Sequence, residues 1–181
     1  MDREGENLLT VQLDTREDPT IPPFGFVIDY LTYGGLYREV WLEATAESRL
    51  TDLFVYTPTL QEAVVQWTAE LTPAAAAVRI RLENADGALL AEQTAPVAET
   101  GKMQLSVPEA QPWDTEHPVL HHAIAELLNA AGQPIDRKQV TFGFRTAEFR
   151  ADGFYLNGKK TFLRGLNRHQ SYPYIGYAAP E

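Results

Sequence analysis

The stretch from Leu50 to Arg145 repeats one pattern, and this pattern constrains the fold more than any other feature of the sequence. Short runs of alternating apolar and polar residues are separated by Pro, Gly and Asp residues that favour turns. Seven runs have the length of β-strands: Leu50–Thr57, Ala63–Leu71, Ala77–Glu83, Ala88–Thr94, Lys102–Val107, Val119–Leu128 and Gln139–Arg145. Such a series in about a hundred residues predicts an antiparallel, immunoglobulin-like β-sandwich.

The core of this sandwich has to rest on side-chain packing, because the chain contains no cysteine and therefore no disulfide. Its expected members are Val65, Trp67, Val78, Ile80 and Leu82. Two runs, "PAAAAVRIRL" and "HHAIAELLNAAG", conflict with this interpretation, since Ala, Leu and Glu favour a helix. We nevertheless expect strands in both, because the sandwich needs them.

Strands are also expected on both sides of the sandwich. Residues 7–14, "NLLTVQLD", alternate so that Leu9, Val11 and Leu13 share one face, and "YREVWLEAT" at residues 37–45 predicts a second strand. Towards the C-terminus, "GFYLNGKKTFLRG" predicts two short strands joined by Asn157-Gly158, the strongest two-residue hairpin signal.

The composition excludes several classes of partner. Twenty-five acidic residues against 15 basic ones give a formal charge of −10, which disfavours nucleic acid and anionic membranes. No apolar run approaches the roughly 20 residues of a membrane helix. Metal binding by "EHPVLHH" is not expected, because His121 and His122 would point to opposite faces of a strand. We expect no cofactor within the chain, and the lack of cysteine favours the cytoplasm while leaving the compartment open.

Three stretches resemble the family 2 glycoside hydrolases, the group that contains β-galactosidases, β-glucuronidases and β-mannosidases. They are "IDYLTYGGLYREVWLE" at residues 28–43, "FGFRTAEF" at 142–149 and "FYLNGKKTFLRGLNRHQSYP" at 154–173. The resemblance implies three parts: residues 1–46 end a jelly-roll, sugar-binding-like domain, residues 47–146 form the sandwich, and residues 147–181 open a (β/α)8 barrel with a hairpin and the first barrel strand.

The resemblance also implies three substrate-binding residues. Asp29 matches an Asp ahead of the "YGG" turn that accepts hydrogen bonds from the sugar, although an Asp here can equally cap its own turn. His169 matches a His that contacts the sugar beside the scissile bond, where the plain alternative is an exposed loop histidine. Asn167 either bonds a sugar hydroxyl or braces the loop.

The chain is therefore expected to be a piece of a retaining exo-β-glycosidase, with β-galactosidase as the leading candidate and a β-linked carbohydrate as substrate. Retaining enzymes use two carboxyl groups about 5–5.5 Å apart, and the resemblance places both beyond this chain, so we expect no catalytic residue in it and no activity from it alone. A homo-oligomer is compatible with the sequence. The alternative is a stand-alone β-sandwich that serves as a binding or adhesion module.

Overall fold

The computed structural model describes residues 5–16, 18, 20, 34–167, 172–176 and 178. The chain divides into two units, one of residues 43–164 and one that joins residues 1–42 to residues 165–181. All ten strands of the described residues lie in the first unit. Within the described residues, no helix is long and apolar enough to span a membrane.

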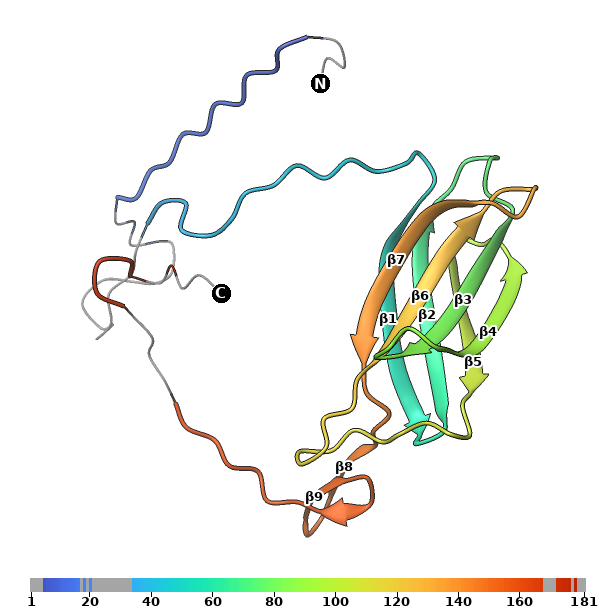
Figure 1. The fold of residues 1–181 in the computed structure, drawn as a ribbon. Coiled ribbons are helices and arrows are strands. Elements are labelled where there is room, and N and C mark those ends of the chain that lie inside the picture. The colour runs from blue at the N-terminus through green and yellow to red at the C-terminus, as the bar shows by residue number, and fades with distance from the viewer. Residues whose placement is uncertain are drawn as a thin grey trace. The chain divides into compact units, whose positions relative to one another are not determined.

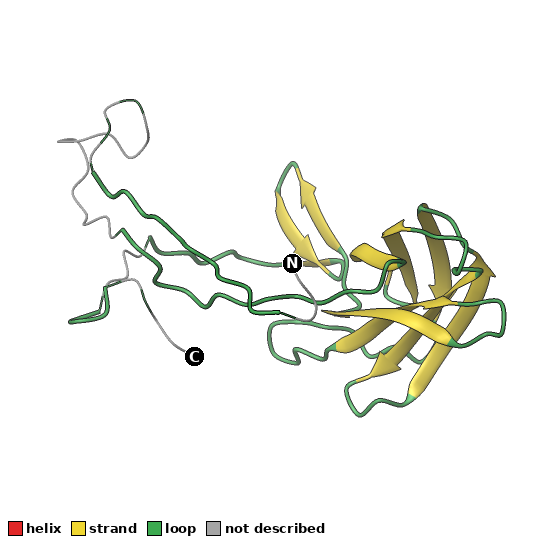
Figure 2. Ribbon diagram, turned by 90° about the horizontal axis from the view of Figure 1, so that it is seen from above, coloured by secondary structure: helices red, strands yellow, loops and turns green. Residues whose placement is uncertain are grey.

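Two antiparallel sheets face each other in residues 49–142 (Figures 1 and 2). One has the order β1-β2-β5 and the other the order β4-β3-β6-β7. The strands are β1 (Arg49–Thr59), β2 (Glu62–Glu70), β3 (Ala77–Asn84), β4 (Leu89–Pro96), β5 (Thr100–Ser106), β6 (His121–Leu128) and β7 (Pro134–Phe142). The predicted fold class, a mainly β chain built on an antiparallel sandwich, is confirmed.

The core lies between the two sheets, where alternate residues of each strand point inward. All five predicted core residues, Val65, Trp67, Val78, Ile80 and Leu82, are buried, which confirms that expectation. The cluster also includes residues of the other strands, among them Leu53 of β1, Met103 and Leu105 of β5, and Ala123, Ala125 and Leu127 of β6.

β6 shows why helix-favouring residues form a strand here. It lies between β3 and β7, and pairs with both along its whole length. Ala123 and Ala125 are fully buried against the opposite sheet, and Ile124 is buried on the outer face. A position with backbone partners on both sides overrides a local preference of a few tenths of a kcal/mol per residue, about the size of ordinary helix propensities.

Some strand boundaries differ from the prediction. β7 spans Pro134–Phe142 instead of residues 139–145, and its first residue is a proline, whose missing N–H is tolerated at a strand start. β5 begins at Thr100, so Gly101 lies inside the strand and is not part of a break.

A three-stranded hairpin sheet follows the sandwich: β8 (Ala147–Arg150), β9 (Gly153–Leu156) and β10 (Lys159–Lys160). Asn157 and Gly158 have φ values of 51° and 75°. Two consecutive positive φ angles are what a type I′ turn requires, and Leu156 pairs with Lys159 across it. The predicted Asn-Gly hairpin is confirmed, whereas β8 was not expected.

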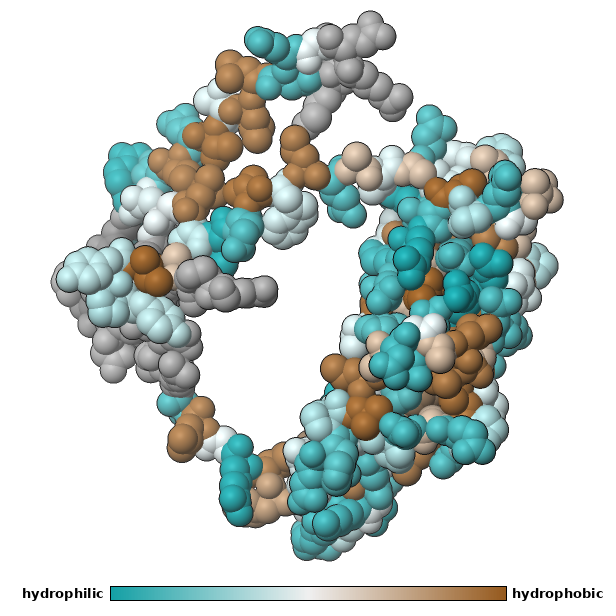
Figure 3. Space-filling view, in the orientation of Figure 1, coloured by the Kyte–Doolittle hydropathy of each residue, from teal (hydrophilic) through white to brown (hydrophobic). Residues whose placement is uncertain are grey.

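The strands predicted at residues 7–14 and 37–45 are not observed. Residues 5–16 and 34–46 contain no strand, and Leu9, Val11 and Leu13 are 70%, 56% and 53% exposed; Figure 3 shows the hydrophobic surface that the first segment presents. Of the second strand predicted in "GFYLNGKKTFLRG", only Lys159–Lys160 is a strand, and residues 161–167 are irregular. Alternation alone does not make a strand, since the backbone also needs a neighbouring strand with which to bond.

Candidate functional site

The three residues predicted to bind substrate are only partly covered by the structure. Asn167 is exposed and lies at the end of the irregular segment 161–167. Asp29 and His169 lie outside the described residues. Their roles therefore stay predictions.

Asn157 ties the hairpin to the end of the sandwich. Its side-chain Nδ2 donates to the carbonyl oxygen of Trp113 at 2.9 Å, and its Oδ1 accepts from the backbone N–H of Thr146 at 2.9 Å. Its own N–H donates to the Thr146 carbonyl, also at 2.9 Å. We call the contacts among Trp113, Phe144, Thr146 and Asn157 the hairpin joint. Three hydrogen bonds to one residue fix the direction in which the chain leaves the sandwich.

Trp113 is the centre of this joint. The backbone N–H of Trp113 donates to the Phe144 carbonyl at 2.8 Å. The guanidinium carbon of Arg145 lies 4.5 Å from the centroid of the Trp113 indole ring. A Cβ atom at Gly143 would lie 2.6 Å from the Cβ of Trp113, so only glycine allows this approach. Thr57 of β1 adds a hydrogen bond from its hydroxyl to the Arg145 carbonyl at 2.6 Å.

His121 belongs to an aromatic cluster beside the joint. Its ring contacts Phe142 and Phe144 with centroid distances of 5.8 and 4.9 Å, and the residue is only 3% exposed. Burial, followed by the nearby charge of His122, lowers the pKa of His121. The imidazole is therefore neutral at pH 7, and its Nδ1 has no hydrogen-bond partner among the described residues.

The neighbouring His122 faces the other side of the sheet, where its Nδ1 lies 3.3 Å from the hydroxyl of Thr141. The part of the chain that the structure describes contains no group of His, Cys, Asp and Glu residues that could hold a metal ion. The histidines of this region are thus packing and hydrogen-bonding residues in the described geometry.

An ion pair stabilises the outer face of the four-stranded sheet. The Arg79 guanidinium lies 2.7 Å from a carboxylate oxygen of Glu126 on the neighbouring strand, and the Glu126 side chain is 9% exposed. A general acid or base has to be reached by substrate. Glu126 is paired and buried, so we assign it a structural role in the sheet and not a catalytic one.

The model of glycosyl hydrolases family 2 matches residues 48–145, which include the whole sandwich. The β-galactosidase of Thermoanaerobacter pseudethanolicus is 36% identical over 185 residues, an alignment that covers 97% of this chain and 25% of that protein. The β-galactosidase of Rhizobium meliloti is 37% identical, with 96% of this chain and 24% of that protein covered.

Solved structures of β-glucuronidases superpose on this chain. β-Glucuronidase 3 of Bacteroides uniformis superposes with a TM-score of 0.76 at 26% identity, over 93% of this chain and 22% of that one. The β-glucuronidase of Bifidobacterium dentium, at 24% identity and a TM-score of 0.66, shares the fold over 75% of this chain and 24% of its own. The chain thus spans about a quarter of the length of the relatives that it matches.

Proposed function

Because this chain belongs to glycosyl hydrolase family 2, we propose that it is one part of a retaining exo-β-glycosidase that removes terminal β-linked sugars, with β-galactosides as the preferred class. The observation that carries this proposal is the alignment of almost the whole chain with β-galactosidases. The same alignment favours an enzyme over the alternative of a stand-alone adhesion module, because it extends through both flanks of the sandwich.

In this proposal the sandwich is a spacer, and the hairpin joint holds the base of the hairpin on the sandwich. Asn167 follows ten positions after Asn157 in the sequence. Asn167 would then bond a sugar hydroxyl together with Asp29 and His169, while the two catalytic carboxyl groups come from the remaining part of the enzyme.

The hairpin carries apolar surface that suits a neighbouring domain. Phe149, Phe162 and Leu163 are 82%, 83% and 59% exposed. With Phe154 they line a depression of about 660 Å³ on the hairpin, and Phe149 lies 5.1 Å from the Phe154 ring. Exposed apolar groups gathered in this way mark a contact surface, and we infer that the rest of the enzyme covers it.

Activity assays test the proposal directly. The whole enzyme and the 181-residue chain would be assayed with aryl β-galactoside, β-glucuronide and β-mannoside. We expect the whole enzyme to hydrolyse the galactoside fastest, with a β-configured first product by NMR, and the chain to be inactive. Turnover by the chain alone would overturn the division of roles, and an inactive or inverting whole enzyme would overturn the assigned reaction.

Asn167 can be tested in the same assay. In the whole enzyme, Asn167→Ala should lower kcat/KM by about tenfold or more, the effect of about one hydrogen bond to substrate. Gln93→Ala, an exposed amide on β4, is the matched control and should leave kcat/KM unchanged. Equal kinetics for both variants would exclude Asn167 from the substrate site.

A further inference from the structure

Two aromatic rings are exposed on the outer face of the three-stranded sheet. Phe54 and Tyr56 are two residues apart on β1 and so share a face. They are 55% and 41% exposed, although the core is one residue away at Leu53 and Val55. Their ring centroids are 6.1 Å apart with an angle of 31° between the planes. The outer face of an antiparallel sheet is usually polar, so this exposed ring pair is a candidate contact surface for a ligand or a partner.

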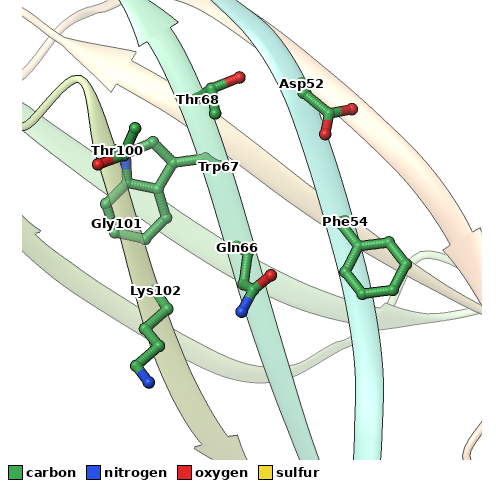
Figure 4. Close-up of a pocket in the computed structure, with 8 residues that line it drawn as sticks. All are labelled: Asp52, Phe54, Gln66, Trp67, Thr68, Thr100, Gly101 and Lys102. Carbon is green, nitrogen blue, oxygen red and sulfur yellow. The ribbon is translucent and has the colours of Figure 1, made fainter.

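The strand register surrounds Phe54 with hydrogen-bonding groups. Phe54 pairs with Gln66, which pairs with Lys102, so that a ring, an amide and an ammonium group form one row across the sheet. The parallel row consists of Asp52, Thr68 and Thr100. These six residues line a shallow depression of about 370 Å³, and Figure 4 shows them on the three strands. We call this surface, together with Tyr56, the Phe54 face.

A second depression continues the surface on the other side of Phe54. It measures about 390 Å³, and Phe54, Tyr56, Thr141 and Arg145 contribute to its lining. Because Phe54 lines both depressions, a ligand that covers the ring pair can extend into each of them. The two depressions therefore extend from the ring pair in both directions across the strands, one over β2 and β5 and the other towards the end of β7.

The chemistry of the Phe54 face selects among possible ligands. An apolar protein surface would bury Asp52 and Lys102 without providing partners for their charges, which is costly. A nucleic acid would meet a chain of charge −10. A sugar chain fits both features: its C–H faces lie against aromatic rings, and its hydroxyls both donate to carboxylate and accept from ammonium and amide groups. One carboxylate and one ammonium group balance each other, which favours an uncharged ligand.

We propose that the Phe54 face is a binding site for an uncharged oligosaccharide chain. The ring centroids lie 6.1 Å apart, so one oligosaccharide chain can cover Phe54 and Tyr56 together. Hydroxyls of the sugar on Phe54 reach Gln66 and Lys102 on one side. This site would hold a polymer against the sandwich, which goes beyond the hydrolysis of a terminal sugar.

Affinity electrophoresis of the 181-residue chain tests this site without any need for activity. Migration would be compared in gels that contain soluble β-1,4-galactan, β-1,4-xylan, the α-linked glucan dextran, or no polymer. We expect retardation by a β-linked polymer and none by dextran. Phe54→Ala and Tyr56→Ala should each weaken retardation at least tenfold, whereas Phe54→Tyr should preserve it. Phe149→Ala removes an exposed ring of the hairpin and is the matched control, with unchanged retardation.

Three outcomes would overturn the proposal. The first is migration of the wild-type chain that no β-linked polymer changes. The second is retardation that survives both alanine substitutions while circular dichroism shows them folded. The third concerns the whole enzyme: if Phe54→Ala lowers its melting temperature and leaves polymer retention unchanged, the face is a contact between domains. None of these results depends on whether the enzyme hydrolyses β-galactosides.

Discussion

Gly101 is the position at which a single methyl group should most clearly disturb the sandwich. It faces Trp67 across the β2–β5 ladder, on the side that points into the core. A Cβ atom at Gly101 would lie 2.6 Å from Cη2 and 2.8 Å from Cε2 of the indole. Real Cβ atoms do not approach other atoms this closely, so in the Gly101→Ala variant the indole has to move.

The expected loss of stability follows from the packing and the hydrogen bond that the indole loses when it moves. Overpacking a core side chain costs about 1–3 kcal/mol. The indole Nε1 also donates to the Ala98 carbonyl at 3.1 Å, and a displaced ring gives up this bond, which contributes about 1 kcal/mol. The lower chain entropy of unfolded alanine returns about 0.4–1 kcal/mol. We therefore expect the free energy of unfolding to fall by about 1–3 kcal/mol.

Urea denaturation followed by far-UV circular dichroism measures this change. Gly165→Ala is the matched control, because no atom of the residues that the structure describes lies within 4 Å of a Cβ at Gly165, and its φ is not in the left-handed region. Combining Gly101→Ala with Trp67→Phe provides a second check, since the smaller ring leaves room for the methyl group. The steric reasoning is refuted if Gly101→Ala is as stable as the Gly165 variant, or if its cost is the same with phenylalanine at position 67.

Three further substitutions test the joint, the buried histidine and the buried ion pair. Asn157→Ala removes two side-chain hydrogen bonds, so the Thr146 amide should exchange with deuterium about tenfold faster or more; unchanged exchange would disprove the joint. The pKa of His121 lies below its ordinary value of 6.5, so the unfolded chain takes up a proton first as the pH falls. The wild-type chain should thus lose stability below about pH 6.5, and His121→Leu should flatten that part of the curve of unfolding free energy against pH; an equal slope would contradict this. Glu126→Ala leaves Arg79 without its carboxylate and should cost about 1–3 kcal/mol in urea denaturation, less than for a fully buried pair because Arg79 is 28% exposed. The cost should shrink in an Arg79→Ala background, and a constant cost would argue against the pair.

The sandwich was predictable because the alternation of apolar and polar residues along its strands indicates which side chains are buried. In β3, the inward residues Val78, Ile80 and Leu82 alternate with polar outward ones. The neighbouring strands β4 and β6 supply its backbone hydrogen-bond partners. Residues 7–14 show the same alternation, yet no strand forms there. The difference lies in the partner strand, which the local sequence does not contain. Conversely, β8 forms from four exposed residues without an apolar pattern, because β9 pairs with it.

The candidate site was less predictable, since its supports come from distant parts of the chain. The sequence identified Asn157 as a turn residue, and the positive φ of 51° agrees. Its hydrogen bond to Trp113, however, joins residues 44 positions apart, and no local pattern signals it. The substrate-binding roles of Asp29, Asn167 and His169 rest on family resemblance, because the sequence around a single polar residue does not indicate which ligand the residue binds.

The tryptophans show how such distant supports arise. Trp67 lies against Gly101, and Trp113 lies against Gly143; in each case a Cβ on the glycine would collide with the tryptophan. Trp41, in a segment without strands, is 74% exposed. A glycine next to a strand is usually interpreted as a break, as the Thr100-Gly101 pair was here, but Gly101 lies within β5. A glycine inside a strand can equally be the space that an aromatic ring from another strand fills. Gly101 thus leaves the space in which Trp67 packs in the core, and Gly143, directly after β7, leaves the space for Trp113 at the base of the hairpin that leads to Asn167.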